Sequence, residues 1–426
     1  MLETLTTLLA LSAIFSFLNE RYIKKPLAIG LMAQALCLSV FLNTLIYFYP
    51  TFLQSHFMAN IVKIDFSRFV LQGVLCFLLF AGAKDISLVA LRKYKWDVLS
   101  LALFSTVLAA LLIGCMIYII FQWIGVEIHY LHALLFGAII APTDPIAALA
   151  VLKSVGLPQS LEVIIDGESQ FNDGVGVVLF VTLLTVLSGE SQGGLGHMSI
   201  MFIKSVIGGI ALGLLLGFLM HHLILNAVTT ITQVLITLSM VTITYTVAEV
   251  IGISGPIASV VLGIYFGNIT LVQEKIQQVR QHVDLFWELI SQVLNAILFV
   301  LIGLVALGVN LGNFLILTSM LLAVLVVLAG RFVSVYVSML LLKIDHRFQF
   351  TSTKKVSMLL TWSGLKGALA IALVLALPDE PFKNLLIPMV YGVVVFSILV
   401  QGSTIKKLYP KNRLNELLIK QRDSEG

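Results

Sequence analysis

Residues 131–152 read LHALLFGAIIAPTDPIAALAVL, an apolar run as long as a helix that crosses a bilayer, which takes about 20 residues. Near its centre the run is interrupted by Pro142, Thr143, Asp144 and Pro145. Two prolines around an acid cannot continue a regular helix, so the sequence predicts a break here. A break inside a membrane frees backbone carbonyls and half-helix ends that can bind ions. The alternative is a proline kink in which Asp144 only caps the second half of the helix.

The composition of the whole chain is typical of a membrane protein. Of its 426 residues, 59% are hydrophobic and 11% are charged, and the mean hydropathy is +1.03. A soluble domain carries about 25% charged residues. We therefore expect an all-α polytopic membrane protein. Apolar runs separated by short polar breaks predict thirteen spans, or twelve if one long run is divided differently, at residues 4–18, 27–49, 66–83, 97–123, 131–152, 160–187, 199–220, 223–250, 255–270, 283–308, 314–342, 355–377 and 383–402.

The basic residues predict how the chain is oriented. With thirteen spans, 20 of the 26 Lys and Arg residues fall in breaks on one side of the membrane. By the positive-inside rule this side is cytoplasmic, which places the N-terminus outside and the C-terminus in the cytoplasm. The lack of sorting signals and the short tail favour a prokaryotic inner (plasma) membrane. No break is long enough for a soluble domain, so we expect one membrane unit over residues 1–403 and a short cytoplasmic tail over residues 404–426.

Polar side chains cluster at the start of the sixth predicted span. They are Glu162, Asp166, Glu168, Ser169, Asn172 and Asp173. Ser169 lies four residues before Asp173, and Glu168 has the same spacing to Asn172, which puts these oxygen-bearing groups on adjoining faces of one helix. We expect them to converge on one point; for Glu162 and Asp166 the alternative is a solvated helix entrance.

Carboxylate, hydroxyl and backbone carbonyl oxygens are hard ligands that suit Na⁺ or Li⁺, and no Cys or His cluster for a transition metal lies nearby in the sequence. Burial favours the protonated form of a carboxylate, so one site can hold either a proton or a cation. Competition between the two is itself a mechanism of exchange. The sequence therefore predicts proton-coupled cation transport, with Na⁺ or Li⁺ and H⁺ as transported ions and no cofactor.

Two basic residues lie inside predicted spans. Arg331, in the middle of residues 314–342, needs a buried counter-charge, for which Glu168 is our candidate; a direct role at the ion site is the alternative. Lys366 lies in the stretch GLKGA at residues 364–368, where paired glycines loosen the twelfth span.

The twelfth span is seven helices after the broken fifth one, so the two run in opposite directions. This arrangement is typical of two inverted-topology repeats whose broken helices cross, with Lys366 compensating the half-helix dipoles. The alternative is a glycine-lined packing surface with Lys366 near its edge.

Four stretches together resemble the cation/proton antiporter superfamily: APTDP at 141–145, GESQFNDG at 167–174, FWEL at 286–289 with Leu294-Asn295, and GLKGA at 364–368. The likeness is greatest to the Asn-Asp branch, which includes prokaryotic sodium/proton antiporters and eukaryotic sodium/hydrogen exchangers. It implies a thirteen-helix homodimer in which a six-helix core domain, formed in part by residues 66–187 and 314–403, moves against a dimerisation domain. It also implies alternating access and an electroneutral 1:1 exchange.

The same resemblance implies roles for particular residues. Asp173 is then the principal carrier of the ion and the proton, and Asn172 steadies the site where electrogenic relatives have a second Asp. The implied Na⁺ site comprises Asp173, Asp144, Ser169 and Thr143, with Glu168 paired to Arg331. This chain has Lys366 where the family motif commonly has arginine, and Phe80-Ala81-Gly82 where some relatives carry an acid.

Other functions were weighed against exchange. A passive cation channel could use the same oxygen ligands, although two broken helices suit alternating access better. An intramembrane aspartic protease would resemble others of its class in a Gly-x-Gly-Asp motif, which neither Asp144 nor Asp173 satisfies. An ATP-driven pump is disfavoured because the sequence lacks a Gly-x-x-x-x-Gly-Lys-[Ser/Thr] loop. We therefore expect a transporter and not an enzyme, with the lipid bilayer and a second copy of the chain as partners and with no nucleic acid or nucleotide.

Overall fold

The computed structural model describes residues 2–48, 66–188, 195–273, 277–308, 314–344, 350–379 and 382–417. Within these ranges the named elements are helices, and Asp144 and Leu365 form an isolated antiparallel bridge. The expected all-α class is therefore confirmed. Of the predicted tail at 404–426, only the part up to residue 417 lies in the described residues.

The helices of the first half of the chain follow the predicted apolar runs. They are α1 (Leu2–Leu18), η1 (Asn19–Ile23), α2 (Leu27–Phe48), α5 (Phe66–Arg68), η2 (Phe69–Val74), α6 (Leu75–Lys84), α7 (Leu88–Lys93), α8 (Lys95–Leu99), η3 (Ser100–Ser105), α9 (Thr106–Trp123), α10 (Tyr130–Ile140), α11 (Ile146–Ser154) and α12 (Gln159–Leu187). The π-helical segments η2 and η3 join their neighbours into continuous helices.

The second half of the chain continues in the same manner. Its helices are α13 (Leu195–Asn226), α14 (Thr230–Val250), α15 (Gly255–Tyr265), η4 (Phe266–Thr270), α16 (Gln277–Val305), η6 (Ala306–Gly308), α17 (Phe314–Ile344), α18 (Thr353–Ser363), α19 (Ala368–Leu375), α20 (Lys383–Phe396), η7 (Ser397–Gln401), α21 (Gly402–Leu408) and α22 (Lys411–Asn415).

Nine helices in the described ranges are long and apolar enough to cross a membrane. Two shorter apolar helices, Tyr130–Ile140 and Gly255–Thr270, accompany them. The chain is therefore a multi-pass membrane protein, while the full number of crossings stays a prediction.

The division between the seventh and eighth predicted spans lies later than the sequence indicated. Helix α13 continues through His221 and His222 to Asn226. The Nδ1 atom of His221 lies 3.1 Å from the Thr270 hydroxyl, so this polar residue has a partner within the fold. Helix α14 begins directly after Thr229, whose side chain accepts a hydrogen bond from a backbone N–H in the first turn of α14. The cap, and not the histidine pair, marks the break.

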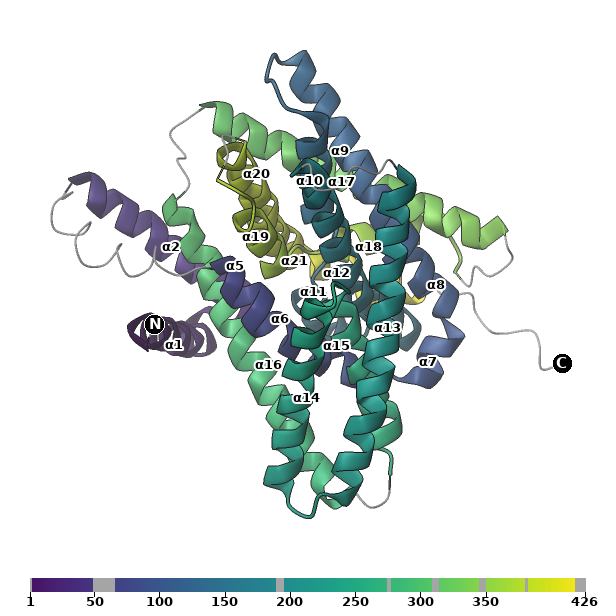
Figure 1. Ribbon diagram of the computed structural model, residues 1–426. Coiled ribbons are helices and arrows are strands. Elements are labelled where there is room, and N and C mark those ends of the chain that lie inside the picture. The colour runs from purple at the N-terminus through teal and green to yellow at the C-terminus, as the bar shows by residue number, and fades with distance from the viewer. Residues whose placement is uncertain are drawn as a thin grey trace.

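The helices pack in two groups (Figure 1). In one group, α17 packs on α9, α18 and α20, and α10 packs on α9 and α12. In the other, α15 packs on α6, α13 and α14, while α16 runs as a long diagonal beside α1 and α2. Helix α12 contacts both groups, since it touches α10 on one side and α13 and α15 on the other. Polar residues on α12 are therefore placed where the two groups meet.

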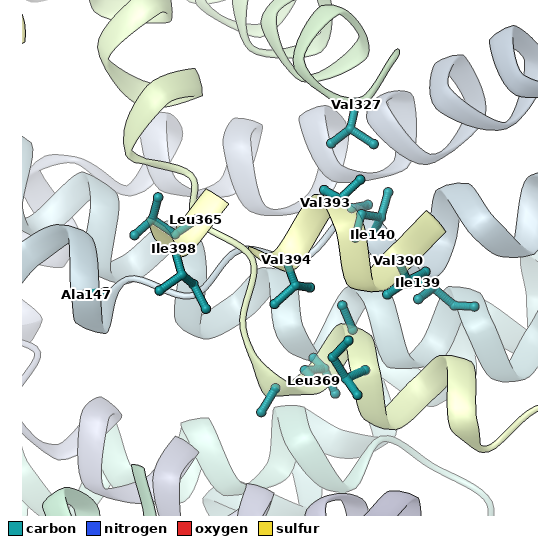
Figure 2. Packing of buried hydrophobic residues seen from close by; sticks show 14 of the residues in the cluster. Ile139, Ile140, Ala147, Val327, Leu365, Leu369, Val390, Val393, Val394 and Ile398 are labelled. Atoms are coloured by element: carbon teal, nitrogen blue, oxygen red, sulfur yellow. The ribbon is translucent and has the colours of Figure 1, made fainter. Parts of the chain in front are cut away.

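A buried apolar cluster surrounds the point where the two interrupted helices approach each other (Figure 2). Leu365, between α18 and α19, lies beside Ile398 of η7 and next to Ala147 at the start of α11. Val393 of α20 lies near Ile140 at the end of α10. All five residues belong to the main core cluster, so the unwound segments are held within apolar surroundings.

Candidate ion-binding site

The first break lies where the prolines predict it. Helix α10 ends at Ile140, and α11 begins at Ile146. Pro142 and Pro145 cannot donate backbone hydrogen bonds, which ends the regular helix between them. The Oδ1 atom of Asp144 accepts a hydrogen bond of 2.9 Å from the backbone N–H of Ile146. One oxygen of Asp144 therefore does cap the second half-helix, which leaves its Oδ2 atom for other contacts.

A second break lies between Ser363, the last residue of α18, and Ala368, the first of α19. The two breaks meet, because the backbone N–H of Asp144 donates a hydrogen bond of 2.8 Å to the carbonyl oxygen of Leu365. Gly367 lies against the Asp144 carboxylate, and a Cβ atom at this position would overlap with Oδ2. The two interrupted helices thus cross at their unwound segments, at a distance that only a glycine permits.

Lys366 lies inside this crossing and is only 3% exposed. Its Nζ atom donates hydrogen bonds of 3.0 Å to the carbonyl oxygens of Ala141 and Pro142. These carbonyls follow the end of α10 and have lost their helical partners, and they form the negative end of its dipole. The Ser397 hydroxyl fixes the other side of Lys366 by accepting its backbone N–H at 3.0 Å. Lys366 is thus buried at a half-helix end and does not lie at the edge of a packing surface.

Asn172 joins α12 to the first break. Its Nδ2 atom donates a hydrogen bond of 2.8 Å to Thr143 Oγ1, and its Oδ1 atom accepts one of 3.3 Å from the Thr143 backbone N–H. Ser169, one turn earlier on α12, has its hydroxyl 3.1 Å from that of Thr143. All three residues are buried, so the unwound peptide at Thr143 is held by both its backbone and its side chain.

Glu168 and Arg331 form an ion pair between α12 and α17, through Glu168 Oε1 and Arg331 Nη2. Each side chain is 3% exposed, so the pair is shielded from water. The Nε and Nη1 atoms of Arg331 are also buried and have no hydrogen-bond partner among the described residues. The structure thus brings together the two residues that the sequence paired, and Arg331 does not reach the cavity described next.

A cavity of about 70 Å³ opens beside the crossing. Its polar wall is formed by Thr143, Asp144, Gln170, Asp173 and Asn295. Asp144 and Asp173 are both partly buried, and both belong to this wall. Ser169 is not part of this wall and reaches it only through its contact with Thr143. The volume can hold a small cation together with a few water molecules.

The possible cation ligands on this wall are oxygens of carboxylates, a hydroxyl and side-chain amides, which suit hard cations such as Na⁺ or Li⁺. In the described part of the chain, no three His, Cys, Asp or Glu side chains form a group that could hold a metal ion. The arrangement therefore offers an exchangeable cation two carboxylates and neutral oxygens, in a setting where either carboxylate can alternatively take up a proton.

The acidic residues before the site divide into two kinds. Glu162 forms an ion pair of 2.7 Å with Lys153, and the two side chains are 34% and 53% exposed, as expected for a solvated helix entrance. Asp166, one turn later, is partly buried, and Gln170 follows it by four residues on the same face of α12. Asp166 therefore belongs to the polar face of α12 that leads towards Asp173.

Three residues at the site received no role from the sequence. Gln170 stands inside the GESQFNDG motif, and its position three residues before Asp173 was a usable signal for a shared helix face. Asn295 of α16 belongs to a stretch that carries the family resemblance, but that resemblance gave it no role, and Ser397 of η7 gave no signal. Their helices come from distant parts of the chain, and a hydrophobic pattern does not say which helices face one another.

Comparison with known proteins gives a consistent result. A family model described as "Sodium/hydrogen exchanger, transmembrane" matches residues 5–410. The Na⁺/H⁺ antiporter NhaP of Pseudomonas aeruginosa is 36% identical over 411 residues, which is 96% of each chain. The Na⁺/H⁺ antiporter NhaH of Halobacillus dabanensis is 33% identical over 327 residues, 75% of this chain and 77% of that protein.

The fold also matches a solved structure. A sodium proton antiporter from Methanocaldococcus jannaschii, determined at pH 8, superimposes with a TM-score of 0.74 over 96% of this chain and 97% of that one. The sequences are 18% identical, so this likeness concerns the fold.

Proposed function

Since the chain belongs to the sodium/hydrogen exchanger family, we propose that it exchanges sodium ions for protons across a membrane and that Asp173 is the carboxylate which both ions use. The chain is a transporter and not an enzyme. The observation that carries the assignment of Asp173 is its place on the wall of the cavity at the crossing of the two broken helices, together with Asp144.

The chemistry of exchange follows from competition at this wall. A carboxylate at membrane depth carries its negative charge at a cost, which either a proton or a bound cation removes. Asp173 then holds one of the two at a time, with Asp144 and the Thr143 segment supplying further oxygens for Na⁺ or Li⁺. Release of one ion on each side, followed by binding of the other, moves the two in opposite directions.

The surrounding residues hold the two broken helices and α12 in place while the charge of Asp173 changes. Lys366 stabilises the end of α10, Asn172 holds the Thr143 peptide, and Glu168 with Arg331 ties α12 to α17. None of these contacts uses the Asp173 carboxylate. An exchange of one Na⁺ for one H⁺ at a single carboxylate is electroneutral, because the site has the same charge in both loaded states.

The movement that exposes the site is alternating access. The packing supports a core of α8–α12 and α17–α21 that moves against the remaining helices, since α12 lies between the two groups. This division assigns α6 to the second group, where it packs on α15, while α5 also contacts α19 of the core. A homodimer through that second group, a cytoplasmic C-terminus and a prokaryotic inner membrane complete the proposal.

The test uses purified full-length protein in liposomes that contain a pH-sensitive dye. Adding Na⁺ or Li⁺ outside vesicles with an acidic lumen should make the lumen more alkaline, and Asp173→Asn should abolish this response because the amide cannot exchange a proton. Glu162→Gln is the matched control, since Glu162 pairs with Lys153 at the solvated entrance and should leave the response intact.

Two outcomes would contradict the proposal. A response that persists in Asp173→Asn would remove the carrier role from this residue. A Na⁺ flux without counter-movement of protons would indicate a passive channel. Clamping the membrane potential with valinomycin and K⁺ tests the stoichiometry, because a 1:1 exchanger should be insensitive to the potential.

A further inference from the structure

Gln170 is a polar residue of the cavity wall to which neither the sequence nor the proposed mechanism gives a role. It is 7% exposed and lies on α12, four residues after Asp166 and three before Asp173. This spacing puts the three side chains on one face of the helix. Its Oε1 atom is buried and has no hydrogen-bond donor among the described residues. A buried carbonyl without a donor costs free energy, so its retention at a cavity calls for an explanation.

Gln170 packs against α6. Its Nε2 atom lies against Gly82 of α6, where a Cβ atom would overlap with it. The carbonyl oxygen is the atom of the amide that is buried without a hydrogen-bond partner among the described residues.

The cavity offers this oxygen one kind of partner. Gln170 shares the wall with Asp173 and Asn295, and the space of about 70 Å³ admits a small cation. Side-chain amide oxygens are good ligands for hard cations.

We propose that the side-chain carbonyl of Gln170 is a direct ligand of the transported cation, and that it sets the affinity and selectivity for Na⁺. The proposal rests on the exchange function assigned above to the Asp173 site. A neutral ligand strengthens cation binding and leaves the charge balance of the exchange unchanged. Gly82 acts as a positioning residue, because the Gln170 amide packs against it and it does not line the cavity.

The experiment compares Na⁺ concentration dependence in proteoliposomes for wild type and Gln170→Leu. Leucine keeps the volume and loses the oxygen, so the KM for Na⁺ should rise about tenfold while the maximal rate changes little. The ratio of the KM values for Na⁺ and Li⁺ should change as well, which loss of packing alone would not produce. Gln233→Leu on α14 is the matched control: Gln233 is 4% exposed, its Oε1 atom also lacks a donor among the described residues, and it does not line the cavity.

A second variant displaces the Gln170 amide by changing its neighbour Gly82. Gly82→Ala introduces a methyl group where Nε2 of Gln170 lies, so it should displace the amide and raise the KM for Na⁺ in the same way. Gly82→Ala replaces Gln170→Leu in the experiment if Gln170→Leu does not yield folded protein. Calorimetric titration of the purified variants with Na⁺ measures binding without transport, and it should show the same loss of affinity.

The outcomes separate this inference from the exchange function itself. If wild type exchanges Na⁺ for H⁺ and Gln170→Leu has the same KM, dissociation constant and Na⁺/Li⁺ ratio, the carbonyl is not a ligand. If wild type neither binds Na⁺ nor exchanges it, the proposed function fails instead. A KM that rises equally in Gln233→Leu would also overturn the inference, because the effect would then be structural.

Discussion

Removing one partner of the ion pair between Glu168 and Arg331 should cost far more stability than removing both. Each side chain is 3% exposed, so the remaining charge cannot turn to water. Loss of one partner of a buried pair costs about 3–5 kcal/mol, whereas replacing both by apolar residues of similar volume is often neutral. We therefore expect Glu168→Leu and Arg331→Met to be strongly destabilised, and the double variant to recover most of the loss.

The two single variants should also differ from each other. After Arg331→Met, the remaining glutamate can take up a proton and so lose its charge. For a glutamate in water this costs about 4 kcal/mol at pH 7, which sets an upper limit on the loss of stability from the buried charge. After Glu168→Leu, the guanidinium cannot lose its charge. Two of its nitrogens, Nε and Nη1, already lack a hydrogen-bond partner among the described residues, and the change would orphan the third. Glu168→Leu should therefore be the less stable variant.

The assay is the apparent melting temperature of the four proteins purified in detergent, measured by fluorescence-detected size-exclusion chromatography at pH 6 and pH 8. The penalty of Arg331→Met should shrink at pH 6, since protonation of a carboxylate becomes about 1.4 kcal/mol easier for each pH unit. The penalty of Glu168→Leu should not change with pH. Destabilisations that simply add in the double variant would refute the reasoning, because additivity means that the two residues do not interact.

Two further predictions concern the crossing of the broken helices. Lys366→Met removes the ammonium group that donates hydrogen bonds to two carbonyls, each worth about 1.5–3 kcal/mol, and should therefore lower the melting temperature. Lys366→Arg should retain most of the stability, because it keeps the charge. Thermal denaturation of both variants checks this prediction. Gly367→Ala should abolish exchange in liposomes, since its methyl group would overlap with the Asp144 carboxylate. The control Gly73→Ala should be active, because no neighbouring atom lies within 4 Å of a Cβ at that position. An active Gly367→Ala would show that exchange does not require the close approach of the two breaks.

The sequence by itself determined the class of the protein and the position of its helices. Within a bilayer each span must satisfy its own backbone hydrogen bonds, so the length of the apolar runs defines the helices almost directly. The break around Thr143 was equally predictable, because Pro142 and Pro145 remove donors locally, whatever surrounds them. The partner of Arg331 could also be named, since a buried guanidinium needs a counter-charge and few acids lie at membrane depth.

Only the tertiary structure decided how these elements meet. The contact of Lys366 with Ala141 joins residues 225 positions apart, and that of Glu168 with Arg331 spans 163 positions. The sequence raised the possibility that the fifth and twelfth spans cross, but not that Asp144 both caps α11 and lies against Gly367.

The same limit applies to Gln170, whose orientation depends on Gly82 in a helix from another part of the chain. All membrane-spanning faces are apolar, towards lipid and towards protein alike, so hydrophobicity cannot tell a helix which neighbour it faces. That choice is made by close packing of small residues and by the few buried polar contacts, which exist only once the helices have come together.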